Sequence, residues 1–294
     1  MKQQKSFKDM EQGKLYLVPT PIGNLEDMTF RSVKMLDEAD LIASEDTRNT
    51  QKLLNHFEIK VPQKSLHEQI SLHEHNVKER VPELIALLKE GKKIAQVSDA
   101  GMPSISDPGH ELVLQAIEED IDVISLPGAS AGITALIASG VSPQPFTFYG
   151  FLPRKSNEQK KALEGLKNNH STLIFYESPH RIGKTLINMK EVFGGNQKAV
   201  LCRELTKLFE EYSRGTIESL IEGLEGKTIK GECCLIIEAS VSEQPDDSVL
   251  GLTLVEHVTY LIEEMDFSSK DAIKEVAKIR GLKKQEVYKE FHRE

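Results

Sequence analysis

Hydrophobic and polar positions alternate along residues 14–143 as short apolar runs separated by longer amphipathic stretches. The runs KLYLVPT, DLIAS, KKIAQVS and IDVISLP are each followed by a stretch in which apolar residues recur at helical spacing. Strands that alternate with helices favour a parallel sheet with crossover helices. We therefore predict an α/β domain over residues 13–143, preceded by a flexible tail at residues 1–12.

The pattern changes after the next apolar run, PFTFYGF. The segments STLIFYES, QKAVLCREL, EEYSRGTI and GECCLIIEAS have strand character, with only two or three helical stretches between them. This predicts a mixed sheet in a second α/β domain at residues 144–240. The polar stretch 241–248 is typical of a linker, and residues 249–294 contain three helical periods and no strand. The expected fold is thus two α/β domains and a small C-terminal helical domain.

Composition narrows the classes of function. A length of 294 residues favours more than one domain. A net charge of −9 argues against broad, non-specific binding of nucleic acid. A local basic surface is still compatible with this net charge. Three cysteines without C-x-x-C spacing argue against a disulfide framework and a zinc site, and no metal-ligand cluster is visible. No signal peptide or membrane-spanning run is recognisable, so we expect a cytoplasmic protein.

Three loops at predicted strand ends, residues 18–29, 97–109 and 125–136, are rich in Gly, Pro and small polar residues. Ligands of parallel sheets bind where such loops converge. The middle loop contains two Ser-Asp-x-Gly turns, and the first directly follows a strand, so Asp99 should face the crevice. Turn formation alone is an alternative explanation for it. In the second turn, Asp107 suits an N-cap and Pro108 the first position of a helix.

The third loop lacks bulk from Gly128 to Gly132, so a flat ligand could approach its backbone. Close packing of helix against sheet explains the same residues equally well. The loop has no G-x-G-x-x-G spacing, which disfavours a nicotinamide cofactor. The segment RIGKT is not a P-loop, because Ser178 stands where that motif needs glycine.

Two clusters of mixed charge, FYESPHR and CRELTKLFEE, lie at predicted strand ends of the second domain. Such runs most often form a solvated face, and we keep that interpretation for Glu210 and Glu211. The remaining charged residues of the two clusters are candidates for a functional site, except His180, which we expect at the surface or at the start of a helix.

Seven segments, VPTPIGNLEDMT, ASEDTRNT, VSDAGMPSISDPG, LPGASAG, FYGFLPRK, FYESPHR and RELTK, occur in this order. Together they resemble the bacterial 16S ribosomal RNA (cytidine-2′-O)-methyltransferases of the tetrapyrrole-methylase superfamily, over residues 13–240. The resemblance implies two α/β domains with S-adenosyl-L-methionine (AdoMet) in the cleft between them, usually in a homodimer. It also implies a substrate, a cytidine in the decoding region of the 30S ribosomal subunit, that is methylated on its ribose 2′-oxygen.

Matching the motifs residue by residue implies contacts with AdoMet in all three loops and in the second domain. These residues are Ile22, Ser98, Asp99, Ala100, Ser104, Ile105, Ser130, Ala131, Glu177, Leu205 and Thr206. Methyl transfer to a hydroxyl benefits from a group that takes its proton. Glu204 and Lys207 are our candidates for base or orienting group, and no metal is required. The candidates for contacts with RNA phosphates are Arg154, Arg181, Arg203, Lys283 and Lys284.

The C-terminal stretch has the spacing of a helix–turn–helix. Ser268 or Ser269 is a suitable N-cap for its second helix, which should end at Gly281. Its basic residues could contact RNA phosphates without reading sequence. They are Lys278, Arg280, Lys283, Lys284, Lys289 and Arg293. A three-helix packing element or a dimer element is the alternative.

Two other functions stay open at this point. The first is carbon methylation of a tetrapyrrole precursor; the first loop argues against it, because Pro19, Thr20 and Pro21 stand where porphyrin-methylating relatives have a glycine-rich segment. The second is a non-catalytic, RNA-binding assembly factor that keeps the fold.

Overall fold

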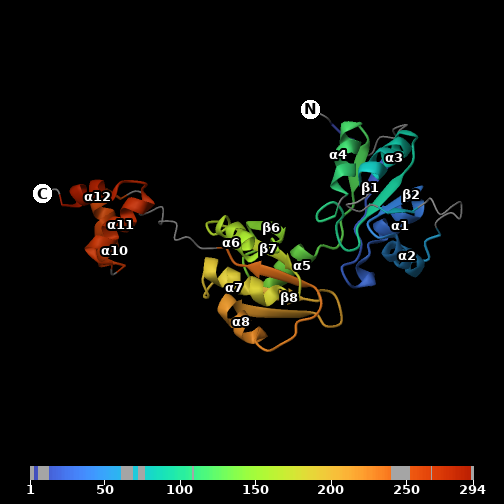
Figure 1. Cartoon of the computed structure of the whole chain (residues 1–294). Coiled ribbons are helices and arrows are strands. Elements are labelled where there is room, and N and C mark those ends of the chain that lie inside the picture. The colour runs from blue at the N-terminus through green and yellow to red at the C-terminus, as the bar shows by residue number, and fades with distance from the viewer. Residues whose placement is uncertain are drawn as a thin grey trace. The chain divides into compact units, whose positions relative to one another are not determined.

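The computed structural model describes residues 3–5, 13–60, 69–71, 77–107, 109–239, 252–265 and 267–292. The chain forms two compact units, residues 1–239 and 240–294 (Figure 1). The first unit contains both predicted α/β domains. The predicted linker, residues 241–248, lies outside the described residues.

The N-terminal domain is built on an all-parallel sheet with the strand order β3-β2-β4-β1-β5. Its strands are β1 (Lys14–Leu17), β2 (Leu41–Ser44), β3 (Gln69–Ser71), β4 (Ile94–Val97) and β5 (Asp122–Ser125). Its helices are η1 (Leu25–Asp27), α1 (Phe30–Glu38), α2 (Thr47–His56), α3 (Val77–Lys89) and α4 (His110–Glu118). The sequence prediction of a parallel sheet is confirmed, and β3 is a strand that it missed.

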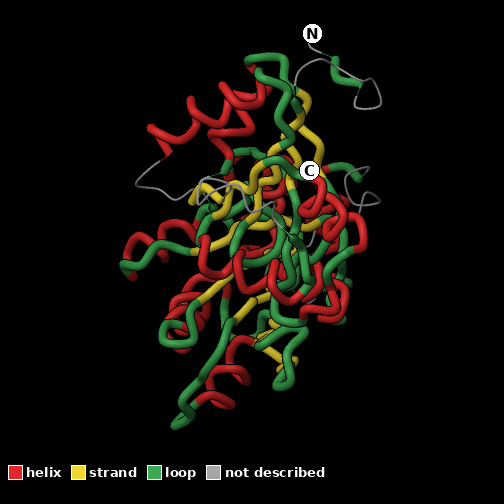
Figure 2. Tube along the Cα trace, turned by 90° about the vertical axis from the view of Figure 1, so that its right-hand side faces the viewer, coloured by secondary structure: helices red, strands yellow, loops and turns green. Residues whose placement is uncertain are grey.

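Alternate residues of these strands enter two cores, one on each face of the sheet. Leu15 and Ala43 pack with α3 and α4, whereas Val18 and Ile42 pack with α1 and α2. Since both faces are covered, the strands are almost continuously apolar, as expected for a parallel sheet. Figure 2 shows the helices, strands and loops of the chain in a view turned by 90° from that of Figure 1.

The second domain is built on a mixed sheet with the strand order β6-β7-β10-β8-β9, which confirms the prediction. Only β6 and β7 run parallel; the other neighbours are antiparallel. Its strands are β6 (Phe146–Phe151), β7 (Thr172–Glu177), β8 (Lys198–Arg203), β9 (Glu211–Thr216) and β10 (Cys233–Ile237). Its helices are α5 (Ala131–Ser139), α6 (Ser156–Glu164), α7 (Ile182–Phe193) and α8 (Ile217–Leu224).

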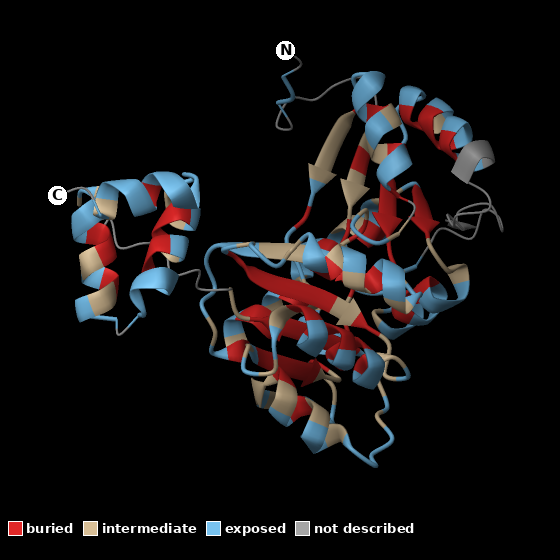
Figure 3. Cartoon of the chain, turned by 60° about the vertical axis from the view of Figure 1, so that its left-hand side comes forward, coloured by how far each residue is buried: buried red, intermediate tan, exposed pale blue. Residues whose placement is uncertain are grey.

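Helices α6, α7 and α8 cover one face of this sheet, and α5 covers the other. Phe175 and Leu235 are buried under the first group, while Ile174 and Ile236 contact α5. Figure 3 shows the resulting pattern of buried strands and outwardly exposed helices. Because α5 follows β5 of the first sheet and packs on the second, it connects the two domains.

The C-terminal unit consists of α10 (Leu254–Glu263), α11 (Ser269–Ile279) and α12 (Lys284–Phe291), packed around Val258, Ile273 and Val287. Ser268 is the N-cap of α11, accepting a hydrogen bond from the Asp271 amide, as predicted. The predicted RNA-contact residue Arg280 instead donates to the Leu252 carbonyl and to His257 Nδ1 inside the unit. Arg293 lies outside the described residues.

One further expectation about the first unit differs from the structure. Helix α4 begins at His110 with Gly109 as its N-cap, so Asp107 is not the capping residue; Pro108 lies outside the described residues. At the N-terminus, where a flexible tail is expected, the Gln4 side chain exchanges two hydrogen bonds with the main chain of Val123 on β5. In the part of the chain that the structure describes, no helix is long and apolar enough to cross a membrane.

Candidate cofactor and substrate site

The first two loops are joined by main-chain hydrogen bonds. The Thr20 amide donates to the Gly101 carbonyl (3.0 Å), and the Gly101 amide donates back to Thr20 (3.1 Å). Gly101 has φ +78°, and a Cβ there would lie 3.3 Å from Ile22 Cγ2 and 3.4 Å from the Ala129 carbonyl oxygen. Glycine is therefore needed at the point where all three loops meet.

The third loop is packed tightly against both domains. A Cβ at Gly128 would lie 2.5 Å from the Pro19 Cβ, and one at Gly132 would lie 3.3 Å from the Phe148 ring. The Gly132 amide donates to the Tyr176 hydroxyl of β7 (3.0 Å). Close packing thus explains these two glycines, while Ser130 and Ala131 between them face the cleft described next.

A cleft of about 440 Å³ is lined by residues of both α/β domains. It is large enough for a small-molecule ligand, since such pockets usually measure about 300–1,000 Å³. All the predicted cofactor residues except two line it: Ile22, Ser98, Asp99, Ala100, Ile105, Ser130, Ala131, Glu177 and Leu205. Sequence reasoning missed other lining residues, among them Glu45, Asp107, Glu232 and Cys234.

Ser104 and Thr206 do not line the cleft. Ser104 has φ +68°, and its hydroxyl accepts a hydrogen bond from the Gln96 side chain (2.9 Å). Thr206 has φ +66°, an uncommon conformation for a β-branched residue. Its hydroxyl oxygen is buried and has no hydrogen-bond partner among the described residues.

The cleft is acidic. Of its described lining residues, Glu45, Asp99, Asp107, Glu177 and Glu232 are carboxylates, and none is lysine, arginine or histidine. Burial raises the pKa of Glu45, and the neighbouring carboxylates of Asp99 and Asp107 raise it further. Such a lining suits a ligand that carries positive charge. AdoMet, a sulfonium with an ammonium group, fits this set of residues.

Asp99 lies at the centre of a hydrogen-bond network. Its carboxylate accepts from the Asp46 amide (3.2 Å) and from the Asn49 side chain (3.1 Å), and its own amide donates to Glu45 (3.1 Å). The network joins the doubled turn to the start of α2. The second turn also contributes to the cleft: Asp107 accepts from the Ser104 amide (2.7 Å) and lines the same space.

Glu177 and Arg181 are occupied by internal contacts. Only 3% of Glu177 is exposed, and its carboxylate accepts from Thr185 (2.6 Å) and from the Ser178 amide (2.7 Å). Arg181, predicted to contact RNA, lies 3.3 Å from that carboxylate and donates to the carbonyls of Leu152 and Pro153. Arg154, the neighbouring candidate for RNA, is exposed.

A second hollow of about 340 Å³ shares Ile22, Ser98, Asp99, Ala100 and Glu232 with the cleft. Thr20, Asn49, Lys52 and Lys207 are among the residues that line it and not the cleft. A ligand there would be separated from the cleft only by these shared residues.

Lys207 is held between two carboxylates, Glu204 (2.9 Å) and Glu232 (3.0 Å). Burial alone would lower the pKa of Lys207, but these two hydrogen bonds outweigh it and raise the pKa. The same bond from Lys207 lowers the pKa of Glu204. Lys207 is therefore a fixed, charged group at the wall of the second hollow.

Glu204 lines neither the cleft nor the second hollow. Its carboxylate also accepts from the Glu232 amide (2.9 Å), and a Cβ at Gly231 would lie 2.3 Å from the Glu204 carboxyl carbon. This geometry favours Glu204 as a residue that positions Lys207 and the start of β10, rather than as a base in contact with substrate.

The family model for Tetrapyrrole (Corrin/Porphyrin) Methylases matches residues 14–221. The chain belongs to the tetrapyrrole methylase family. Within it, the chain is 54% identical to a Ribosomal RNA small subunit methyltransferase I of Streptococcus pyogenes, over 99% of each chain. Proteins of the same name from Halalkalibacterium halodurans and Bacillus subtilis are 50% and 49% identical, over 100% and 99% of each chain.

Solved structures show the same fold at lower identity. Uroporphyrin-III-C-methyltransferase of Thermus thermophilus is 21% identical with a TM-score of 0.52, over 77% of this chain and 94% of that one. A diphthine synthase is 15% identical with a TM-score of 0.58, over 77% and 90%. Tetrapyrrole methylases use AdoMet as methyl donor, which agrees with the acidic cleft.

Proposed function

We propose that this protein transfers the methyl group of AdoMet to 16S rRNA of the small ribosomal subunit, at the ribose 2′-oxygen of a cytidine in the decoding region. Relatives of about half-identical sequence, named as small-subunit rRNA methyltransferases, support the rRNA substrate. The observation that carries the proposal is the wall shared by the cleft and the second hollow. It allows a donor and an acceptor to bind side by side.

In this proposal the larger cleft holds AdoMet, which supplies an electrophilic methyl group when it is bound. Asp99 and Glu45 would accept hydrogen bonds from the donor groups of the ligand, as carboxylates do for hydroxyl and ammonium groups. Ile22, Ile105 and Leu205 provide apolar surface in the same cleft. Ser130 and Ala131, at the start of α5, present little bulk at its wall.

The second hollow would receive the target ribose. Lys207 lies at its wall with a fixed position, so it can orient the ribose hydroxyl or the adjoining phosphate. Orientation of two reactants can itself contribute several kcal/mol to a displacement of this kind. Glu204 contributes indirectly, because it holds Lys207.

The C-terminal unit would contribute further contacts with RNA phosphates. Lys278, Lys283, Lys284 and Lys289 are exposed on α11, on α12 and at the turn between them. Together with Arg154 they are our candidates for phosphate contacts, which position an enzyme without reading sequence. We also propose a homodimer and, because the substrate is ribosomal, a cytoplasmic location.

The test is methyl transfer from labelled AdoMet to 30S subunits, free 16S rRNA and a porphyrin precursor, followed by mapping of ribose methylation. Label on a single 2′-O-methylcytidine of 16S rRNA is the expected result. Label on the porphyrin precursor alone would favour the tetrapyrrole alternative. Binding of RNA without any transfer would favour a non-catalytic assembly factor.

A further inference from the structure

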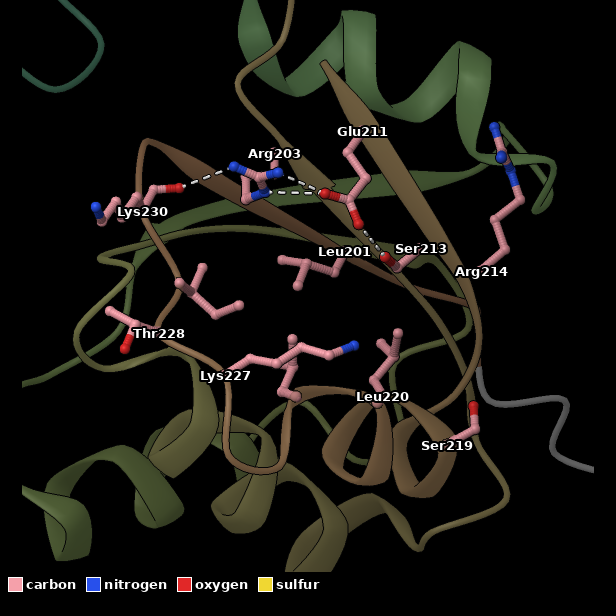
Figure 4. Close-up of a pocket in the computed structure, with 13 residues that line it drawn as sticks. Leu201, Arg203, Glu211, Ser213, Arg214, Ser219, Leu220, Lys227, Thr228 and Lys230 are labelled. Carbon is pink, nitrogen blue, oxygen red and sulfur yellow. Dashed lines mark hydrogen bonds and ion pairs between the residues drawn. The ribbon is translucent and has the colours of Figure 1, made fainter. Parts of the chain in front are cut away.

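The second domain contains another hollow, of about 730 Å³, on the side of its sheet that α8 covers (Figure 4). It lies between the end of β8, the edge strand β9, α8 and the segment 227–230. None of its lining residues lines the cleft or the second hollow. It is therefore a separate site from the one assigned to AdoMet and the target ribose.

The charge of this hollow is opposite to that of the cleft. Its basic lining residues are Arg203, Arg214, Lys227 and Lys230, and Glu211 is the only carboxylate among its described lining residues. The Arg214 guanidinium points away from the hollow and donates to the carbonyls of Ala138 and Ser139, so the positive charge inside the hollow comes from Arg203, Lys227 and Lys230 (Figure 4). The whole chain, in contrast, carries a net charge of −9. A local excess of positive charge on an acidic protein indicates an anionic ligand.

The basic groups differ in how they are occupied. Arg203 donates to Glu211 through Nε (3.1 Å) and Nη2 (2.5 Å), and to the Lys230 carbonyl through Nη1 (3.3 Å). The side chains of Lys227 and Lys230 have no hydrogen-bond or ion-pair partner in the described part of the chain. In Figure 4 the Lys227 side chain extends toward the middle of the residues that line the hollow. The charge of Lys227 helps to lower the pKa of Glu211, but no ion pair or hydrogen bond within the described residues holds either ammonium group, so both lysines are available to a ligand.

The floor of the hollow is apolar. It is formed by Leu201 and Leu220, which are buried, together with Leu224 and Ile229. An apolar floor below unpaired ammonium groups suits a ligand with phosphates at its edge and a sugar or base beneath them. RNA offers that combination at every nucleotide.

Two short segments of chain join the hollow and the cleft: Arg203 lines the hollow and Leu205 the cleft, and the second segment follows Lys230. Lys230 lines the hollow, and Glu232, two residues further on, lines the cleft. Two residues span at most about 7 Å. Glu204 fixes this segment through the Glu232 amide (2.9 Å).

We propose that this hollow binds phosphate groups of the RNA substrate near the target nucleotide, with Lys227 and Lys230 as the main contacts. The inference rests on the proposed function and specifies where part of the RNA binds. The Arg203–Glu211 pair limits the affinity of the site, because the Glu211 carboxylate repels a phosphate and occupies Arg203.

The test compares the full-length protein with Lys227→Glu/Lys230→Glu and with a control, Lys167→Glu, an exposed lysine of the same domain that does not line the hollow. We expect the double variant to bind 30S subunits at least about tenfold more weakly, and the slope of log affinity against log salt to fall by about two. The KM for RNA should rise by a similar factor, while AdoMet affinity stays as in the wild type. Glu211→Gln should bind RNA more tightly than the wild type.

Several results would overturn the proposal. The first is a double variant that binds RNA with the same affinity and salt dependence as the unmodified enzyme, when the unmodified enzyme does methylate rRNA. If the unmodified enzyme does not methylate rRNA, that result contradicts the proposed function instead. Tight binding of ATP or pyrophosphate at this hollow, without competition by RNA, would show a free-nucleotide site. A change in oligomeric state of the double variant at unchanged RNA affinity would show an interface between copies of the chain.

Discussion

Replacing Asp99 by asparagine tests the assignment of the acidic cleft. Asp99 borders both the cleft and the second hollow, and its carboxylate already accepts from the Asp46 amide and the Asn49 side chain. Asparagine keeps the size of the side chain but removes the charge. Water competes for an exposed carboxylate, so we expect a loss of about 1–2 kcal/mol in AdoMet binding, in the lower part of the range for charged hydrogen bonds. This corresponds to about 5- to 30-fold in Kd.

Isothermal titration of AdoMet into the wild type, Asp99→Asn and the control Asp37→Asn would measure this loss. Asp37 is an exposed carboxylate of α1 that does not line the cleft, so its loss of charge should leave Kd unchanged. Thermal unfolding of each variant shows whether the two internal hydrogen bonds of Asp99 matter for stability. An unchanged Kd in a folded Asp99→Asn variant would refute the assignment of Asp99 to the cofactor.

Three further predictions concern other parts of the chain. Lys207→Met and Glu204→Gln should lower kcat much more than AdoMet affinity, because Lys207 lines the second hollow and Glu204 holds Lys207 in place. Wild-type kcat in both variants would remove them from the site. A chain ending at residue 239 should keep AdoMet affinity and lose affinity for 30S subunits, unless the C-terminal helices only stabilise the fold. Burial raises the pKa of Glu45 in the folded protein above its usual value of 4.5. The contribution of the Glu45 carboxyl to folding stability is therefore fully present below pH 4.5 and is lost as the pH rises through the raised pKa. Glu45→Gln should therefore raise Tm at pH 7 relative to wild type and not at pH 4; equal Tm differences at both would contradict this.

The parallel strands could be predicted because they are buried on both faces and so form nearly continuous apolar runs. Strand β3, Gln69–Ser71, gives no such signal, since only one of its three residues is apolar. The capping role expected of Asp107 fails for a different reason. Its carboxylate accepts hydrogen bonds from the amides of Ser104 and Gly109, and so stabilises the turn before α4 instead of capping the helix.

The cleft was only partly predictable because lining a cleft depends on backbone conformation. Nothing in the residue types says that Ser104 turns inward to Gln96. Glu45 had a usable signal: it directly follows strand β2, as Asp99 follows β4, and both carboxylates line the same space. Glu232 had none, because it precedes an antiparallel strand that reaches the cleft from the opposite direction.

The opposite charges of the cleft and the hollow beside β9 bear on how one acidic protein could act on RNA. Five carboxylates line the cleft, and two of them, Glu177 and Glu232, are ion-paired with Arg181 and Lys207. The remaining negative charge attracts a cationic methyl donor and repels phosphates, so RNA affinity has to come from elsewhere on the chain. Among the described residues near the shared wall, Lys207 is the only basic group that two ion pairs hold in place. Both of its partners, Glu204 and Glu232, are carboxylates. Its positive charge is therefore largely compensated, and it can orient a substrate without contributing much to affinity. This division predicts that salt weakens RNA binding through the lysines of the β9 hollow and the C-terminal unit, while AdoMet binding, which involves no phosphate contact, responds to salt far less.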